Sequence, residues 1–367
     1  MSTAQPPLSA DSIEIGLITC SPHEEVYSLY GHSALRYRDL RTGEDFVFNY
    51  GIFNFNKPHF VLRFVFGLTD YELGIAPTRP FCEYYRKWGS QVSEQVLNLT
   101  AQEKRRIADA LSENLRPENR IYRYNYFYDN CSTRPRDIIE RCVDGKIEYA
   151  ARPDDAPTFR QLIHDHTEDH PWARFGNDML LGVKADMKAT QRQQEFLPAY
   201  LKVDFDHATI VSQGQSRPLV AARRTLVEPG LQIVEKEFPL SPMQCAVLLL
   251  IVSLTLLAVE WRRRRTIVAW DVLLMLLQGL SGCIILVMFF SEHPTTSTNL
   301  LITLLNPLPL FFLPAVVRRR KTLWWLLLPV CVVLFFIGGL FQDYAEGMEI
   351  VALCLLTRFV SHYRNDK

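Results

Sequence analysis

The chain has 367 residues, of which 40 are basic and 40 are acidic, so its formal net charge is zero. No basic domain or basic stripe dominates, which argues against a nucleic-acid-binding protein. The composition changes near Pro242, from a charged and aromatic first part to a second part of apolar runs with short basic breaks. We therefore predict an extracytoplasmic soluble domain over 1–240 and a helical transmembrane domain over 241–367.

The first residues, Met1 to Pro7, contain neither the basic stretch nor the apolar stretch of a signal peptide. The basic runs Arg262 to Arg265 and Arg318 to Lys321, between apolar stretches, place the domain that follows outside the cytoplasm. A domain exported ahead of the first membrane span needs such a signal. We infer that a signal segment was removed or replaced.

Three strands are predicted next. Ser12 to Cys20 alternates between apolar and polar residues, while His32 to Arg38 and Phe46 to Gly51 flank a glycine-containing loop that is typical of a β-hairpin. Because a hairpin places its strands side by side, we expect Asn49 to lie next to His32. A histidine that acts as a catalytic base needs a neighbouring polar group that orients its imidazole, and Asn49 would be in the position to do so.

Residues 52–73 are unusually aromatic and contain Phe53, Phe55, Phe60, Phe64, Phe66 and Tyr71. A buried core is the more common role of such side chains. The alternatives are an apolar groove for an acyl chain and a patch that rests on a bilayer. Buried side chains would indicate a core, whereas exposed side chains would indicate a groove or a membrane-facing patch.

A long amphipathic helix is predicted over 100–115, where Thr100 and Glu103 form a capping box. The remaining predicted elements of the soluble part are, in chain order, helix 80–88, strand 93–99, strand 121–127, helix 132–141, helical pieces near 157–165 and 184–196, and strand 226–238.

A cysteine stands directly before the predicted helix 132–141, in the run Tyr128-Asp129-Asn130-Cys131-Ser132-Thr133-Arg134. A thiol is a strong nucleophile only as a thiolate, and a nearby imidazole is the usual means of forming one near neutral pH. The N–H groups and the dipole at a helix start favour the thiolate and can donate to an oxyanion. We therefore predict that Cys131, His32 and Asn49 are catalytic.

Further residues are predicted to bind substrate or to line the oxyanion site: Asn130, Ser132, Arg134, Arg36, Tyr30 and Tyr50. Three residues are alternatives to Asn49 as the third catalytic member: Asp129, Tyr50 and Tyr30. The competing interpretation makes Cys131 a small buried residue or one half of a disulfide, and His32 a satisfied core histidine. A disulfide to Cys20, Cys82 or Cys142 would exclude thiol catalysis by Cys131.

The run from His164 to His170 resembles a metal-binding cluster, because it contains His164, Asp165, His166, Asp169 and His170. The run is polar throughout, however, which is more typical of a solvated loop. Cys-x-x-Cys pairs and glycine-rich phosphate loops are absent from the sequence. We predict neither a metal nor a cofactor.

Five apolar stretches follow, at roughly 242–261, 268–290, 299–317, 323–341 and 347–362. Most of them approach the ~20 residues that a helix needs to cross a hydrocarbon core. The third contains Pro307, Pro309 and Pro314, and we expect a kink or a break there. The fifth is short and carries Glu349 and Arg358, so an interfacial helix is the alternative to a fifth span.

The basic residues between these stretches predict their orientation. Arg262 to Arg265 separate the first two spans, and Arg318 to Lys321 separate the third and fourth, whereas Ser291 to Thr298 and Gln342 to Gly347 contain no Lys or Arg. The positive-inside rule places both basic loops in the cytoplasm. The soluble domain then faces outward and the C-terminus faces the cytoplasm.

Three stretches together resemble the Lnb-type lipoprotein N-acyltransferase domain of bacterial envelopes, notably of Bacteroidetes. They are Tyr30 to Arg36, Phe48 to Phe55 and Asp129 to Asp137. The resemblance covers roughly 12–240, and the trailing membrane spans are also similar to that family. It implies a multi-pass protein of the bacterial inner membrane whose catalytic domain lies in the periplasm.

The chain order of these motifs also resembles that of circularly permuted papain-like enzymes, among them lecithin:retinol acyltransferase and its phospholipid acyltransferase relatives. Asn49 stands where the second polar residue of those enzymes is found. The Glu-His-Phe that follows their cysteine is replaced here by Ser132-Thr133-Arg134, so this likeness is at the level of the fold. It implies an α+β class, with a permuted papain-like thiol-enzyme domain followed by about five transmembrane helices.

What the Lnb resemblance implies is a two-step acyl transfer. Cys131, deprotonated by His32, would take an acyl group from a membrane phospholipid or a diacylated lipoprotein, and the N-terminal amine of a lipoprotein would receive it. Arg134 and Arg36 would bind a lipid phosphate, for which a surface salt bridge is the alternative. Other functions that fit the residues are an envelope thiol hydrolase of lipid esters or peptidoglycan amides, and a non-catalytic scaffold.

Overall fold

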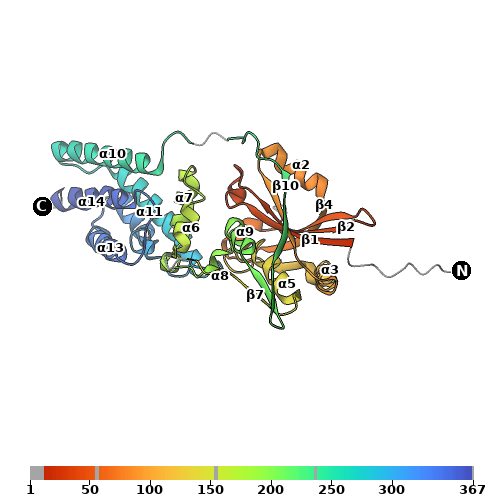
Figure 1. Ribbon diagram of the computed structural model, residues 1–367. Helices are drawn as coiled ribbons and strands as arrows, with labels where there is room; N and C mark the ends of the chain where they lie inside the picture. Colours follow the sequence, from red (N-terminus) through yellow and green to blue (C-terminus); the bar gives the residue numbers. More distant parts are fainter. Residues whose placement is uncertain (1–11, 54–57, 153–155, 235–237, 366–367) are drawn as a thin grey trace. The chain divides into compact units, whose positions relative to one another are not determined.

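The computed structural model describes residues 12–53, 58–152, 156–234 and 238–365 (Figure 1). Two compact units divide the chain: Met1–Ala156 with Ala189–Glu235, and Pro157–Lys188 with Lys236–Lys367. The helical unit therefore includes a segment, 157–188, that precedes the apolar runs by more than fifty residues. The N-terminal stretch and Phe55, for which the sequence made predictions, lie outside the described residues.

The first unit is built on a seven-stranded sheet in the order β10-β5-β1-β2-β3-β4-β6, with antiparallel pairing throughout. Its strands are β1 (Ile13–Cys20), β2 (His32–Asp39), β3 (Asp45–Ile52), β4 (Asp70–Pro77), β5 (Val92–Leu97), β6 (Ile121–Arg123) and β10 (Val220–Val227). A separate three-stranded sheet contains β7 (Lys146–Glu148), β8 (Thr209–Ser212) and β9 (Gln215–Pro218).

Helices cover both faces of the large sheet. Figure 1 shows α2 (Thr78–Trp88) on one side, and α3 (Ala101–Asn114) and α5 (Thr133–Cys142) on the other. The apolar residues of alternate strand positions pack against these two helix layers and form two cores. The unit also contains η2 (Val26–Ser28), α1 (Phe60–Val65), α4 (Pro117–Arg120), α8 (Gln191–Gln194) and α9 (Pro198–Asp206). The mixed α+β class predicted from the sequence is confirmed.

Local sequence signals predicted several elements of this unit correctly. Thr100 and Glu103 form the expected capping box at the start of α3. The strand predicted over 226–238 is wrong, because β10 pairs with β5 over Val220–Val227 instead. Pro229 and Gly230 follow immediately, and neither residue favours the continuation of a strand.

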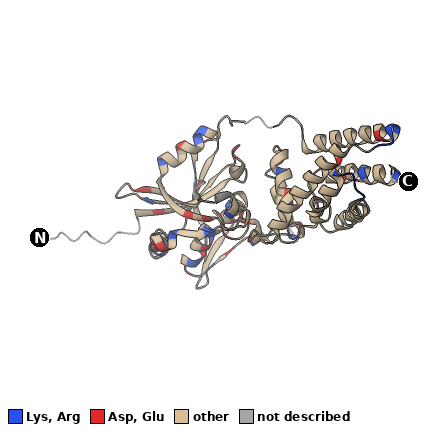
Figure 2. Cartoon of the chain, turned by 180° about the vertical axis from the view of Figure 1, so that it is seen from behind, with Lys and Arg blue, Asp and Glu red and all other residues tan. Residues whose placement is uncertain are grey.

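The second unit contains the apolar helices α10 (Pro242–Arg263), α11 (Val268–Met288), α12 (Leu308–Val317), α13 (Trp324–Gly338) and α14 (Met348–Asn365). The segment 157–188 contributes α6 (Phe159–His164), α7 (Pro171–Leu180) and η3 (Val183–Asp186). Figure 2 shows Lys and Arg near the C-terminal ends of α10 and α14. Among the described residues, three helical stretches are long and apolar enough to cross a membrane: 242–263, 268–288 and 300–317.

The third of these stretches is broken, as its prolines predicted. The turn η4 (Leu300–Thr303) ends before Asn306, and α12 begins only at Leu308. The break exposes backbone carbonyls that a lipid environment cannot satisfy. Gln278 of α11 donates its Nε2–H to the carbonyl of Leu304 at 2.7 Å. Helix α11 therefore compensates for the interruption in its neighbour.

Candidate active site

The hairpin of β2 and β3 brings His32 and Asn49 together, as the sequence predicted. In this hairpin Leu35 pairs with Phe48. When the register is continued along both strands, His32 lies opposite Gly51, and Asn49 lies diagonally across from His32 on the same face of the sheet. The Nε2 atom of His32 is 2.6 Å from Oδ1 of Asn49. Nε2–H therefore donates to Asn49, and the Nδ1 side of the ring remains for another partner.

That partner is the sulfur of Cys131, which is buried and lies just before α5. Burial raises the pKa of the thiol. The positive charge of His32 and its hydrogen bond to the sulfur lower that pKa, as do the backbone N–H of Ser33 and the hydroxyl of Ser132, so the net pKa is below its usual value. These three groups thus favour a thiolate despite burial.

The effect on His32 is reciprocal. Burial lowers the pKa of the imidazole, whereas the charge and hydrogen bond of Cys131 and the hydrogen bond to Asn49 raise it, and the net pKa is raised. Both shifts, a lowered thiol pKa and a raised imidazole pKa, increase the population of the thiolate–imidazolium pair. This pair is the state from which a cysteine attacks a carbonyl.

The turn that presents Cys131 is built by Asn130. Its Oδ1 accepts from the backbone N–H groups of Ser132 (2.8 Å) and Thr133 (3.0 Å), and its Nδ2 donates to the carbonyls of Tyr126 (2.9 Å) and Phe196 (2.8 Å). We expected Asn130 among the substrate or oxyanion groups. Because both of its N–H donors are committed to carbonyls, Asn130 shapes the turn instead.

Two residues that the sequence analysis did not select complete the site. Ser33, next to His32, offers its N–H to the sulfur, and its hydroxyl lies 3.0 Å from the hydroxyl of Ser132. Gly51 has a positive φ of 95°, and a Cβ added there would lie 3.8 Å from Cβ of Cys131. The positive φ favours glycine at this position, because L side chains rarely adopt that backbone conformation. The glycine that ends the Phe-Asn-Tyr-Gly motif was the available signal.

The two arginines have partners within the protein. Arg36 is buried and bonds both Asp45 and Glu94, at 2.6–2.8 Å. Arg134 forms a bidentate pair with Asp129 at 2.6 and 2.8 Å and lies over the ring of Tyr122. The structure therefore places both guanidinium groups in salt bridges, but the pair of Arg36 with Glu94 is buried rather than on the surface that the sequence suggested.

The other candidates for the third catalytic position have other partners. The hydroxyl of Tyr50 accepts from Asn114 at 2.8 Å, and its side chain is buried in the core on the far face of the strand. Asp129 is paired with Arg134. Tyr30 makes an edge contact with the ring of Tyr126. Of the four residues considered, Asn49 has the geometry to orient the imidazole.

The cysteines do not form disulfides. All eight lie within the described residues and all are free. A bridge to Cys131 was the arrangement that would have excluded thiol chemistry at this position. Its absence leaves the sulfur available to the imidazole.

The described aromatic side chains of 52–73 lie at the edge of the core rather than within it, and Tyr71 packs against it. The described side chains of this group, Phe53, Phe64, Phe66 and Tyr71, are half-buried or exposed, and Phe64 is 45% exposed. Four rings make a continuous series of contacts that we call the aromatic row: Tyr27 with Phe53, Phe53 with Tyr71, and Tyr71 with Tyr124. Tyr124 ends this row beside Gly51 and Cys131.

The histidine-rich run is part of an ion-pair network in the helical unit. Nε2 of His164 lies 2.9 Å from both oxygens of Asp178, and its Nδ1 accepts from Arg174 at 2.9 Å. Arg160 is buried and donates hydrogen bonds to Asp178 and Asp186. Within the described part of the chain, no three His, Cys, Asp or Glu side chains are grouped so that they could hold a metal ion.

Comparison with known protein families identifies both parts of the chain. The model of the Lnb N-terminal periplasmic domain matches residues 3–165, and the model of the Lnb transmembrane domain matches residues 233–367. No curated protein and no solved structure matched the chain.

The two matches occur in the order expected from the sequence, a periplasmic domain followed by membrane-spanning helices. Neither model covers residues 166–232. This range contains the end of the segment 157–188, which belongs to the helical unit, and it also contains the strands β8 to β10. The chain therefore belongs to the Lnb family and is a membrane protein with a periplasmic domain.

Proposed function

We propose that this protein is an acyltransferase that moves an acyl chain from a lipid ester, through a thioester on Cys131, to the N-terminal amine of lipoproteins. The observation that carries the proposal is the chain of contacts from the Cys131 sulfur to His32 and from His32 to Asn49. We place the protein in the bacterial inner membrane, with the catalytic domain in the periplasm and the C-terminus in the cytoplasm.

In the first half-reaction, the Cys131 thiolate attacks the ester carbonyl of a phospholipid or a diacylated lipoprotein. A carbon–sulfur bond forms, the carbon–oxygen bond breaks, and the His32 imidazolium gives its proton to the departing alkoxide, which leaves as an alcohol. The oxyanion of the intermediate needs donors. Because the N–H groups of Ser132 and Thr133 are bonded to Asn130, we assign this role to the backbone N–H of Cys131.

In the second half-reaction, the α-amine of a lipoprotein attacks the thioester. A carbon–nitrogen bond forms, the carbon–sulfur bond breaks, and neutral His32 accepts the proton that the amine loses, which restores the ion pair. A free α-amine titrates at about pH 7.7–8.0, so a base at this point increases the reactive fraction near neutral pH. Asn49 keeps the imidazole in the orientation that both proton transfers require.

The aromatic row supports a lipid as the acyl donor. It extends from Tyr27, whose side chain is 53% exposed, to Tyr124 beside Cys131. Each of these rings presents apolar surface, and an acyl chain that covers such surface gains about 25 cal/mol per Å². A donor and an acceptor that are both confined to the bilayer would also meet an anchored enzyme at high effective concentration.

The proposal is tested in cells that lack other lipoprotein N-acyltransferases, by mass spectrometry of lipoprotein N-termini. We expect wild type and Cys142→Ala to yield N-acylated lipoproteins and Cys131→Ala to yield none. Cys142 is the matched control, since it is a second buried cysteine and lies at the opposite end of α5 from Cys131. N-acylation that persists in Cys131→Ala would overturn the proposal. Release of free fatty acid without amine acylation, dependent on Cys131, would identify a hydrolase instead.

A further inference from the structure

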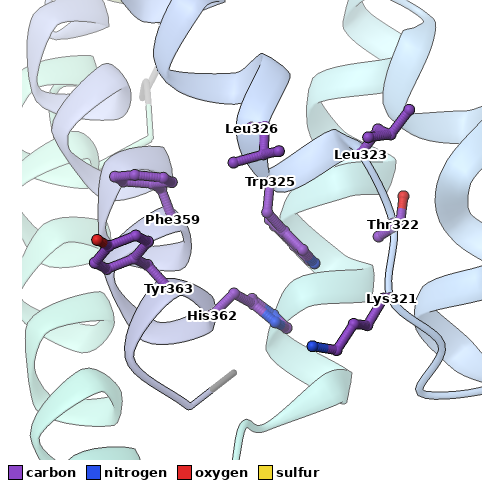
Figure 3. A pocket seen from close by; sticks show the side chains of 8 residues that line it. All are labelled: Lys321, Thr322, Leu323, Trp325, Leu326, Phe359, His362 and Tyr363. Atoms are coloured by element: carbon purple, nitrogen blue, oxygen red, sulfur yellow. The ribbon is translucent and has the colours of Figure 1, made fainter. Parts of the chain in front are cut away.

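The helical unit contains a cavity that lies far along the chain from the cysteine site. It has a volume of about 400 Å³ and lies between the start of α13 and the last turns of α14 (Figure 3). Its polar lining includes Lys321, Thr322 and His362, and its apolar lining includes Trp325, Leu326 and Phe359. Figure 3 shows Lys321 and His362 directed toward one another across the cavity, below Trp325.

A buried charge cluster holds the α14 wall of this cavity in place. Arg358 bonds Glu260 of α10 at 2.7 and 2.9 Å and Asp271 of α11 at 2.6 Å, and all three side chains are buried. His362 lies 3.0 Å from the other oxygen of Asp271 and stacks on Trp325 with ring centroids 3.9 Å apart. The imidazole and the indole that line the cavity are therefore fixed before any ligand binds.

Among the residues that the structure describes, the positive charge at the mouth of the cavity has no acidic partner. Lys321 ends the basic run Arg318 to Lys321. In the described residues, no carboxylate forms an ion pair with any of these four side chains. By contrast, the buried Arg358 has two carboxylate partners. A cationic group beside a hydroxyl group is suited to bind a phosphate.

We propose that this cavity binds the headgroup of an anionic phospholipid. The cavity is apolar on the side away from Lys321, and Leu323 and Leu326 beside it are 66% and 62% exposed in a domain that spans a bilayer. A free phosphate would leave this apolar surface uncovered, whereas the glycerol and acyl chains of a lipid cover it. Because the basic loops face the cytoplasm in the proposed topology, the ligand is a lipid of the inner leaflet.

The experiment uses the full chain purified in mild detergent, with bound ligand measured by native mass spectrometry. The probes are phosphatidylglycerol, phosphatidylcholine with the same acyl chains, and inorganic phosphate. The variants are Lys321→Gln, which removes the charge, and Leu326→Trp, which fills the cavity. Arg262→Gln is the matched control, because it removes one charge from the other basic loop, outside the cavity lining.

We expect one phosphatidylglycerol per chain to be retained in wild type and in Arg262→Gln. Retention should fall about fivefold in Lys321→Gln, because one basic side chain contributes about 1 kcal/mol to binding at an anionic lipid surface. Retention should fall further in Leu326→Trp. Each variant is compared only after its helix content and elution volume match wild type. Equal loss in Lys321→Gln and Arg262→Gln, equal retention of phosphatidylcholine, or competition by inorganic phosphate alone would each overturn the proposal.

Discussion

The Nε2 atom of His32 lies 2.6 Å from the Oδ1 atom of Asn49, and this contact leaves the opposite edge of the imidazole for Cys131. Asn49→Ala should therefore lower the rate of acyl transfer without removing the nucleophile. A hydrogen bond to a charged group contributes about 1.5–3 kcal/mol, which corresponds to roughly tenfold to a hundredfold in rate. Asn49→Asp, which keeps the acceptor, should retain more activity than Asn49→Ala. Equal losses in the two variants would argue that Asn49 has only a structural role.

The reactivity of Cys131 should depend on His32. In wild type the pKa of the thiol is lowered, because His32, Ser33 and Ser132 outweigh burial. In His32→Gln the charge is lost, burial dominates, and the pKa of the thiol should rise. Alkylation of Cys131 by iodoacetamide, followed by peptide mass spectrometry across pH, should shift to higher pH in the variant. An unchanged profile would show that the imidazole does not stabilise the thiolate.

Acyl transfer itself should have a bell-shaped pH dependence. On the acid side the rate falls as the Cys131 thiolate is protonated, and on the alkaline side the first half-reaction falls as the His32 imidazolium loses the proton that the leaving group needs. Since the pKa of Cys131 is lowered and that of His32 is raised, the thiolate and the imidazolium coexist in a larger fraction of the molecules than they would as isolated groups. Measuring single-turnover acylation across pH checks this, and a rate that only rises with pH would contradict the ion pair.

Asn130 should be more important for stability than for chemistry. Asn130→Ala leaves the N–H groups of Ser132 and Thr133 and two carbonyls without their buried partner. An unsatisfied buried group costs about 1–3 kcal/mol, so the unfolding midpoint of the full chain should fall by several degrees. Asn130→Asp keeps the acceptor and loses the donors, and should lie between wild type and alanine. Activity that is lost at an unchanged midpoint would indicate a direct catalytic role.

The aromatic row should determine how the enzyme responds to acyl chain length. Phe53→Asn interrupts the row between Tyr27 and Tyr71, so the rate on a long-chain ester should fall about tenfold relative to the rate on a short-chain ester. Ile121→Asn is the control, because Ile121 is an exposed apolar residue outside the row. The ratio of the two rates is insensitive to a general loss of folded enzyme. A ratio unchanged by Phe53→Asn would remove the row from the acyl-binding site.

The charge cluster of the helical unit predicts a large effect of a single substitution. Arg358→Ala leaves Glu260 and Asp271 buried without their cation, which should cost about 3–5 kcal/mol. The triple variant Arg358→Met, Glu260→Gln and Asp271→Asn should lose much less free energy of unfolding, because no uncompensated charge remains. Unfolding of the purified full chain in detergent measures both, and a similar loss in the single and triple variants would contradict this account.

Several features of this protein were determined by the sequence alone. Alternating residues identified β1 and the hairpin of β2 and β3, and the capping box identified the start of α3. The length of the apolar runs and their prolines located the helices of the second unit and the break before α12. These signals are local, because residue periodicity and end-capping act over a few positions along the chain. The hairpin also placed Asn49 beside His32, since the register of two adjacent strands follows from their connecting loop.

Other features were decided by contacts between distant segments. Pairing with β5 selected 220–227 as the last strand, although the residues after it had the apolar pattern of one. Backbone hydrogen bonds from Gly182 and Val183 to Thr295 and Thr298, and a bond from the Asn299 side chain to Met179, joined 157–188 to the helical unit rather than to the domain it follows in sequence. Asn130 became a turn residue because the carbonyl of Phe196 lies within reach. Each outcome depends on partners more than forty residues away, and a buried polar group is placed by the partner that satisfies it, which no local pattern specifies.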